Sequence, residues 1–178
     1  MKAYAVCTTP RTGSDYLCEL LTDAQLGKPD EFLNPKYRKW GDLEFDNAYE
    51  LAKIAARFDV FGIKLHWSHR HVENPIVLDF DQLHENMRWI YLYRRDTDSQ
   101  ARSWITALER DEWNGTSQPY VDAPEWRVEL FKDVILQRSQ EWQSWFRRKR
   151  IRPLRVEFER LIDDPDNWVR RIKEFVLA

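Results

Sequence analysis

The chain has 178 residues, of which 43% are hydrophobic and 14% aromatic, and its formal net charge is −2 at pH 7. This length suits a single domain, residues 1–178, with a sizeable core, and the small net charge gives no field that would draw the protein to nucleic acid. The N-terminus lacks the apolar stretch of a secretion signal and no apolar run reaches membrane-spanning length, so we expect a cytoplasmic protein that contacts no membrane. Cys7 and Cys18 indicate buried thiols of a reducing compartment, not a disulfide.

The first predicted unit is a strand, a tight loop and a helix. Residues 3–8 are apolar and β-prone, as in a buried strand, and residues 9–14 have the composition of a turn. An apolar stripe that begins after Ser14 predicts a helix. Since the first turn of a helix has unpaired N–H groups and a partial positive charge, this unit is suited to binding an anion.

Side chains of the same loop add donors for an anion. Arg11 supplies a guanidinium, Thr12 and Ser14 supply hydroxyls, and Gly13 allows backbone angles that are closed to other residues. The loop is not the G-x-x-x-x-G-K-[ST] loop of nucleotide hydrolases, because Ser14 and not lysine follows Gly13. The alternative is an ordinary turn in which Ser14 caps the helix, and Asp15 counts slightly in favour of that alternative.

Strands and helices alternate along the rest of the chain. Strands are predicted at residues 60–66, 89–93 and 153–158. Helices are predicted at 47–58, at 81–87, from a capping box at Thr97 and Gln100 to about 113, from Pro124 along an apolar face to Phe146, and at 168–176, with 67–76 as a loop. This alternation predicts an α/β fold, a three-layer α/β/α arrangement with a central parallel sheet of about four or five strands. Ligands of such sheets bind outside the carboxyl ends of the strands.

A second candidate anion site follows the third predicted strand. Arg94 and Arg95 leave that strand together, and the start of the next helix lies directly behind them. Ser99 and Ser103 are four residues apart and therefore share a helix face. Guanidinium, hydroxyl and N–H donors would surround a phosphate here. The alternative is a surface ion pair between one of the arginines and a neighbouring aspartate.

Five blocks of the sequence together resemble the trehalose 2-sulfotransferase family. In chain order they read PRTGS, KPDEF, GIKLHW, YRRDTDSQARSW and PLRVEFERLIDDP, and they cover nearly the whole chain. Those enzymes use 3′-phosphoadenosine 5′-phosphosulfate (PAPS) and belong to the wider sulfotransferase superfamily, whose α/β fold is related to that of P-loop nucleotide kinases. The resemblance therefore implies a P-loop-kinase-like sulfotransferase fold and PAPS as the cofactor.

The resemblance also implies roles for individual residues. Glu31 matches the carboxylate proposed in the family as the general base for the acceptor hydroxyl. The residues matching the 5′-phosphosulfate site are Arg11, Thr12, Gly13 and Ser14, and those matching the 3′-phosphate site are Arg94 and Ser103, with Arg95 and Ser99 close by. Two departures leave a catalytically silent nucleotide-binding module as an alternative, because Asp15 brings negative charge to the loop and the chain stops at Ala178, where family members continue.

Residue chemistry supplies further candidates for catalysis. Sulfuryl transfer resembles phosphoryl transfer, in which charge accumulates on the leaving oxygen, and Arg11 with the helix N-terminus is suited to stabilising that charge. His66 ends the second predicted strand and is a second candidate base, since its reference pKa of about 6.5 suits the role. Lys64 points to the same rim by strand alternation and is a candidate for holding the sulfuryl group or the acceptor. The tryptophans that could stack on adenine or a sugar ring, with core burial as the alternative, are Trp67, Trp104 and Trp113.

We therefore expect a sulfotransferase that moves a sulfuryl group from PAPS to a hydroxyl of a sugar or another small polyol. A nucleotide-dependent kinase is a further alternative, against which the missing Gly-Lys-Ser/Thr sequence counts. No metal is expected, because no cysteine or well-placed carboxylate completes a tetrahedral set with the histidines at 66, 69 and 71. The expected partners are a small hydroxyl-bearing acceptor and, as an option, a second copy of the chain in a homodimer.

Overall fold

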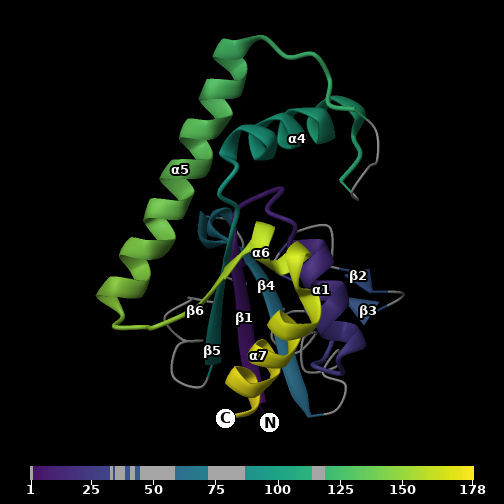
Figure 1. Cartoon of the computed structure of the whole chain (residues 1–178), viewed down its shortest axis with the longest axis vertical. Coiled ribbons are helices and arrows are strands. Elements are labelled where there is room, and N and C mark those ends of the chain that lie inside the picture. The colour runs from purple at the N-terminus through teal and green to yellow at the C-terminus, as the bar shows by residue number, and fades with distance from the viewer. Residues whose placement is uncertain are drawn as a thin grey trace.

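A four-stranded parallel sheet forms the centre of the protein (Figure 1). The computed structural model describes residues 2–32, 34, 39–40, 43–44, 59–71, 87–113 and 119–178. The strands of the sheet are β1 (Lys2–Thr8), β4 (Val60–His66), β5 (Met87–Tyr93) and β6 (Leu154–Glu157), in the spatial order β4-β1-β5-β6. A separate antiparallel pair consists of β2 (Lys39–Trp40) and β3 (Leu43–Glu44). The helices predicted at 47–58 and 81–87 lie outside the described residues.

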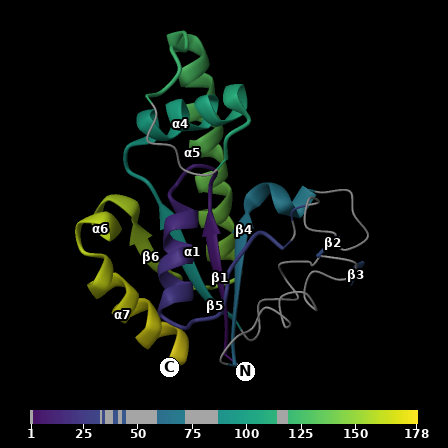
Figure 2. The same ribbon diagram turned by 90° about the vertical axis from the view of Figure 1, so that its right-hand side faces the viewer.

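Helices cover both faces of the sheet, which confirms the predicted α/β fold. The helices on one face are α1 (Ser14–Asp23), α6 (Phe158–Asp163) and α7 (Pro165–Leu177), and α5 (Glu125–Arg148) lies on the other face (Figures 1 and 2). A further helix, α4 (Thr97–Arg110), lies beyond the carboxyl ends of the strands and packs against α5. None of the helices in the described ranges combines the length and the apolar composition needed to cross a bilayer.

Strand β1 lies where the order of the strands reverses, because later strands of the sheet are added on both sides of it. The next strand of this sheet along the chain, β4, pairs with one side of β1, and β5 pairs with the other side. Thr8 is opposite His66 in the register, so the segments that follow β1 and β4 begin at the same edge. In open parallel sheets this position forms the crevice in which ligands bind.

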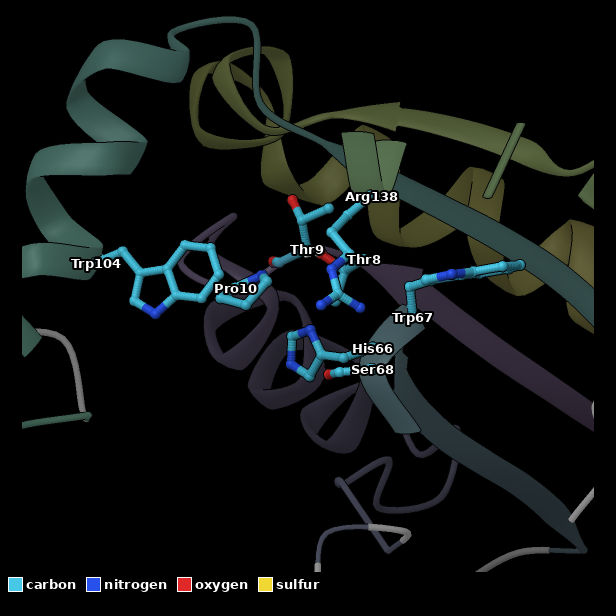
Figure 3. Close-up of a pocket in the computed structure, with 8 residues that line it drawn as sticks. All are labelled: Thr8, Thr9, Pro10, His66, Trp67, Ser68, Trp104 and Arg138. Atoms are coloured by element: carbon cyan, nitrogen blue, oxygen red, sulfur yellow. Dashed lines mark hydrogen bonds between the residues drawn. The ribbon is translucent and has the colours of Figure 1, made fainter. Parts of the chain in front are cut away.

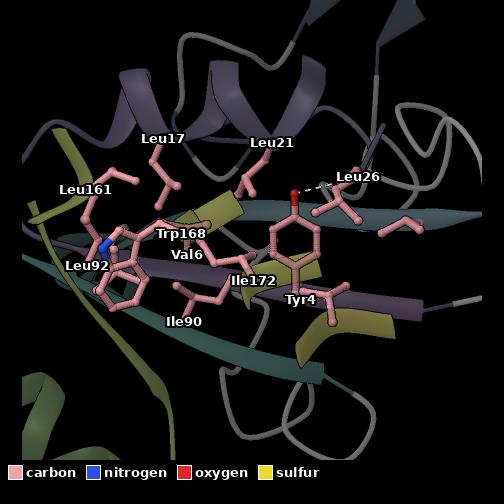
Figure 4. Packing of buried hydrophobic residues seen from close by; sticks show 13 residues of the cluster. Tyr4, Val6, Leu17, Leu21, Leu26, Ile90, Leu92, Leu161, Trp168 and Ile172 are labelled. Atoms are coloured by element: carbon pink, nitrogen blue, oxygen red, sulfur yellow. Dashed lines mark hydrogen bonds between the residues drawn. The ribbon is translucent and has the colours of Figure 1, made fainter. Parts of the chain in front are cut away.

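Alternate side chains of β1 point into two different cores. Tyr4 and Val6 face the core under α1 and α7, where they meet Leu17, Leu21, Leu161, Trp168 and Ile172 (Figure 4). The hydroxyl of Tyr4 donates to the carbonyl of Leu26 at 2.8 Å, so its polar group is satisfied although the side chain is buried. This packing fixes α1, and with it the loop that precedes α1, against the sheet.

The opposite core fixes α5 to the carboxyl end of β1. Trp142, Trp145 and Phe146 of α5 are almost fully buried, and the indole N–H of Trp142 donates to the carbonyl of Thr8 at 3.0 Å. The ring of Trp67 packs edge-on against that of Trp142 with 5.0 Å between centroids. Of the two interpretations of Trp67, burial in the core is therefore correct.

The structure differs from the sequence prediction at several element boundaries and in one loop. Asp96 and not Thr97 caps α4, because the Asp96 carboxylate accepts the N–H of Ser99 at 2.9 Å and Thr97 is already helical. Helix α7 begins at Pro165, earlier than predicted, since Asp164 caps it by accepting the N–H of Asn167 at 3.3 Å. A short 3-10 helix, η2 (Trp67–His71), forms within the segment predicted as a loop.

The two cysteines behave as the sequence predicts. Cys7 in β1 and Cys18 in α1 are free and buried. Burial raises the pKa of Cys18 to about 12 and raises that of Cys7 well above its usual value. Both thiols are therefore protonated near neutral pH and act as small apolar groups of the core.

Candidate active site

The loop between β1 and α1 leaves the start of the helix open to an anion. Gly13 occupies the cap position with φ +88°, and within the described part of the chain no side chain caps the helix. Arg11 also has a positive φ, 61°. The alternative in which Ser14 caps the helix is wrong, because Ser14 is the first helical residue. The N–H groups of the first turn and the positive end of the dipole therefore face the loop.

Phe158 explains why position 13 has no side chain. A Cβ added to Gly13 would lie 2.1 Å from Cε2 of Phe158, and the backbone there is in the left-handed region that glycine adopts freely. The same ring lies under Arg94, whose guanidinium carbon is 5.3 Å from the ring centroid. One aromatic side chain of α6 therefore contacts both predicted anion sites.

Direct hydrogen bonds also join the two predicted anion sites. The Arg11 guanidinium donates through Nε to Oγ of Ser103 at 3.0 Å and through Nη1 to the carbonyl of Trp113. The buried amide of Gln100 donates to the Thr9 hydroxyl at 2.8 Å and to the Pro10 carbonyl at 2.7 Å. Helix α4 is thereby tied to the loop after β1.

Gln100 is a structural contact that the sequence analysis missed. It was interpreted there as part of a capping box, whereas its amide also donates to the Thr12 hydroxyl at 3.1 Å. That hydroxyl in turn donates to the Thr9 carbonyl. Since the hydroxyl proton of Thr12 is used inside the loop, only the backbone N–H of Thr12 faces an incoming anion as a donor.

The second predicted site contains a buried, unpartnered donor. Nε of Arg94 is shielded from solvent and has no hydrogen-bond partner among the described residues. Arg95, in contrast, is 72% exposed and lies 3.6 Å from the carboxylate of Glu157. The suggested ion pair with a neighbouring aspartate is not the one formed, since Asp98 binds Arg102 at 2.8 Å. Arg94 is therefore the stronger of the two arginines as an anion ligand.

Glu31 lies at the centre of a charged cluster at the end of β4. Its Oε1 atom is 2.9 Å from Nζ of Lys64 and 3.1 Å from Nε2 of His66, and its Oε2 atom is 3.8 Å from Nε2 of His69. Lys64 also pairs with Asp15 of α1. The negative charge of Asp15, beside the loop, is thus paired with Lys64. Among the described residues no group of three or more side chains is arranged to hold a metal ion.

These contacts shift the pKa values of the cluster in opposite directions. Burial acts to raise the pKa of Glu31, but the hydrogen bond and charge of His66 and the charge of Lys64 bring it well below its usual value. Burial acts to lower the pKa of Lys64, but Glu31 and Asp15 raise it above its usual value. Burial, together with the neighbouring His66 and Lys64, lowers the pKa of His69 to about 4. Near neutral pH the cluster is therefore an ion pair beside a neutral His69.

A pocket opens between the carboxyl ends of β1 and β4, on the side of α5 (Figure 3). Its lining includes the end of β1, the segment that follows β4, one residue of α4 and one of α5, namely Thr8, Thr9, Pro10, His66, Trp67, Ser68, Trp104 and Arg138. Trp104 was a candidate from the sequence. Arg138 was not, because helical periodicity identifies inward apolar positions and gives no signal for an arginine beside a pocket.

The chain belongs to the Stf0 sulphotransferase family, because the model of that family matches residues 3–177. It is also similar to the trehalose 2-sulfotransferase of Mycolicibacterium smegmatis. The two sequences are 26% identical over 205 residues, which cover 88% of this chain and 77% of that protein. The resemblance inferred from the five sequence blocks is confirmed, and the four-stranded parallel sheet with helices on both faces agrees with it.

Proposed function

We propose that this sulfotransferase moves a sulfuryl group from PAPS to a hydroxyl of a carbohydrate. The observation that carries the proposal is the hydrogen bond from Arg11 to Ser103, which joins two clusters of anion donors along one edge of the sheet. PAPS has a phosphosulfate at one end of its ribose and a phosphate at the other. A continuous edge with two such clusters fits a donor of that form.

In this proposal the loop after β1 binds the phosphosulfate end. The donors are the Arg11 guanidinium, the N–H groups of Thr12, Gly13 and Ser14, and the dipole of α1. Burial lowers the pKa of Arg11 from its usual value, but arginine side chains in proteins remain protonated at neutral pH. The open cap at Gly13 supports this assignment, since no side chain in the described ranges competes for these N–H groups.

The 3′-phosphate binds, in the same proposal, between Arg94 and Ser103, with Arg95 and Ser99 at the margin. The buried Nε of Arg94 without a partner in the described chain supports this assignment, because such a donor is costly unless a ligand satisfies it. Ser103 already interacts with a guanidinium, so its hydroxyl proton is free to be donated to a phosphate oxygen.

The reaction forms one bond to sulfur and breaks another. The oxygen of the acceptor hydroxyl bonds to sulfur, the bond from sulfur to the 5′-phosphate oxygen breaks, and its electron pair leaves with that oxygen. The products are a sulfate ester and 3′,5′-adenosine bisphosphate. Arg11 and the N–H groups of the loop stabilise the charge on the leaving oxygen, and Lys64 is the cation nearest to the candidate base.

Glu31 is the base that takes the acceptor proton in this proposal. Its side chain is 18% exposed, whereas Nδ1 of His66 is shielded from solvent. His66 holds the carboxylate from its other nitrogen and acts as a positioning residue. The pair with Lys64 keeps Glu31 ionised but makes it a weak base. If Lys64 moves from Glu31 towards the charge that develops on the leaving oxygen, Glu31 becomes a stronger base at the moment of transfer.

The test is a transfer assay with PAPS labelled in the sulfuryl group and a panel of sugars. We expect the label in a sugar sulfate and an equal amount of 3′,5′-adenosine bisphosphate, with unchanged rates in the presence of a chelator. Labelled ATP with Mg²⁺ serves as the control donor, and transfer from ATP alone would favour the kinase. Binding of the bisphosphate without any transfer would favour the silent module.

A further inference from the structure

Arg138 extends from α5 into the pocket beside His66 (Figure 3). Its guanidinium lies in the view between Thr8, at the end of β1, and the His66 ring. The Arg138 residue is partly buried, and the Trp104 ring lies on the opposite side of the pocket, beside Pro10. A positive charge thus lines a pocket that also has apolar residues in its wall.

No carboxylate neutralises Arg138 in the described part of the molecule. Apart from His66 and Arg138, the residues lining the pocket have no acidic or basic side chain. Glu141, one helical turn further along α5, accepts a hydrogen bond from Gln137 at 3.2 Å and does not pair with Arg138.

Some arginines of the protein differ from Arg138 in this respect. They pair with carboxylates at ordinary distances, as in Arg102 with Asp98 at 2.8 Å and Arg170 with Glu174 at 3.3 Å. A guanidinium has five donors in a planar fork that matches carboxylate, sulfate and phosphate groups. The unpaired guanidinium in this pocket is therefore suited to an anionic group of a ligand.

The pocket lies on the acceptor side of the proposed reaction. His66 lines it and also contacts Glu31, the proposed base, at 3.1 Å. A molecule that places a hydroxyl at Glu31 and fills this pocket would therefore present its next functional group to Arg138. Ser68 and the Trp104 ring offer a hydroxyl and an aromatic surface, which suit a sugar ring.

We infer that Arg138 binds a negatively charged substituent of the acceptor, so that the preferred acceptor is an acidic carbohydrate. The substituent is a carboxylate, a sulfate ester or a phosphate ester, all of which a guanidinium binds in the same bidentate manner. This inference rests on the proposed function, because it assumes that the acceptor hydroxyl lies at Glu31. It makes Arg138 a specificity-determining residue for that reaction.

The test compares pairs of related sugars in which one member carries an anionic substituent. The probes are methyl glucoside with methyl glucuronide, and trehalose with trehalose 6-phosphate, each with PAPS as the donor. We expect the wild-type protein to have at least tenfold higher kcat/KM for the charged member of one pair. Arg138→Gln should remove that preference by lowering kcat/KM for the charged sugar, and should leave the neutral sugar within twofold.

Two controls separate this inference from its alternatives. Arg148→Gln removes the same charge from the exposed end of the same helix and should leave the preference intact. The affinity for 3′,5′-adenosine bisphosphate, measured by calorimetry, should be unchanged in Arg138→Gln, and a loss of affinity would place Arg138 in the donor site and overturn the inference. Restoration of part of the preference in Arg138→Lys would support a charge effect.

A binding readout keeps the inference testable if no sugar is sulfated. The quenching of tryptophan fluorescence on titration with each sugar, in the presence of the bisphosphate, reports on the pocket because Trp104 lines it. The wild-type protein should bind the charged member of a pair more tightly, and Arg138→Gln should bind both members equally. Equal binding of both members by the wild-type protein would overturn the inference even if the donor site is confirmed.

Discussion

Glu31 shows how single contacts define both the position and the basicity of a group. Lys64 and His66 hold one carboxylate oxygen, and Asn34 donates to the other at 3.0 Å. The same contacts lower the pKa of Glu31, because each one favours the ionised form. The residue is therefore fixed and ionised at neutral pH, at the cost of reduced basicity, and this trade-off can be measured.

We predict that Glu31→Gln and His66→Ala have different kinetic effects. Glu31→Gln removes the proposed base and should lower kcat by about 10²–10⁴-fold, with little change in affinity for the bisphosphate. His66→Ala removes a hydrogen bond that lowers the pKa of Glu31, so the acidic limb of the kcat/KM profile should move to higher pH. Activity at alkaline pH should be retained. If His66→Ala is as inactive as Glu31→Gln at every pH, His66 is the base.

At the scale of elements, the carboxyl end of β1 is fixed by side chains from two helices. Gln100 of α4 holds the loop that follows the strand, and Trp142 of α5 donates to the last carbonyl of the strand. The position of α4 depends in turn on how the helix begins, which makes the cap at Asp96 a point at which the arrangement can be tested.

The cap of α4 gives a prediction at this scale. Asp96→Ala removes the acceptor of the Ser99 N–H and should lower the free energy of unfolding by about 1 kcal/mol. Asp96→Asn should have a much smaller effect, since asparagine caps helices about as well as aspartate does. Thr97→Ala is the matched control and should change stability by less than about 0.5 kcal/mol. Urea unfolding measures these changes. A larger loss of stability in Thr97→Ala than in Asp96→Ala would show that Thr97 caps α4, as the sequence predicted.

The sequence predicts the elements of the described fold better than their contacts. Strands at 3–8 and 60–66 are short apolar runs beside turn residues, and this local signal was sufficient to place them. The cap of α4 could not be resolved in the same way, because Asp96 and Thr97 are both good caps and the backbone angles decide between them. The roles of Gln100 and Arg138 depend on contacts between residues far apart in the chain, for which a single sequence carries no signal.

In the candidate site, too, the sequence identified residues but not the contacts between them. The loop at 9–14 and Arg94 were found from residue type and spacing, and Glu31 from the family resemblance alone. The contacts among Glu31, Lys64 and Asp15 were not predicted, since they join a loop, a strand and a helix. They change the interpretation of Asp15, whose charge pairs with Lys64.

For the whole molecule, the buried cluster makes stability depend on pH. His69 has a pKa of about 4 in the folded protein and about 6.5 in the unfolded chain. Between these two pH values the side chain is neutral in the folded protein and protonated in the unfolded chain. Since the unfolded chain binds a proton first as pH falls, this contribution is present above pH 6.5 and is lost between pH 6.5 and about 4. Glu31 adds a second loss below its unfolded pKa of about 4.3, because its folded pKa is depressed.

We predict that the free energy of unfolding falls by about 3 kcal/mol between pH 7 and pH 4 through His69. His69→Gln should flatten this part of the profile, because glutamine does not titrate, while its oxygen can still accept the N–H of His66 as Nδ1 of His69 does at 3.2 Å. Urea unfolding at several pH values gives both profiles. Equal slopes for the two proteins between pH 6.5 and pH 4.5 would show that His69 is not responsible.

Calorimetry with 3′,5′-adenosine bisphosphate in the presence of a chelator tests directly whether this edge of the sheet binds the sulfuryl donor. We predict metal-independent binding to the wild-type protein and an affinity at least about tenfold lower in Arg11→Ala, because a charge-assisted contact is lost. Arg170→Ala, on the exposed side of α7 and paired with Glu174, is the control and should bind normally. No binding heat from the wild-type protein over a range of temperatures, or equal affinity in Arg11→Ala, would contradict the claim that this edge of the sheet binds the sulfuryl donor.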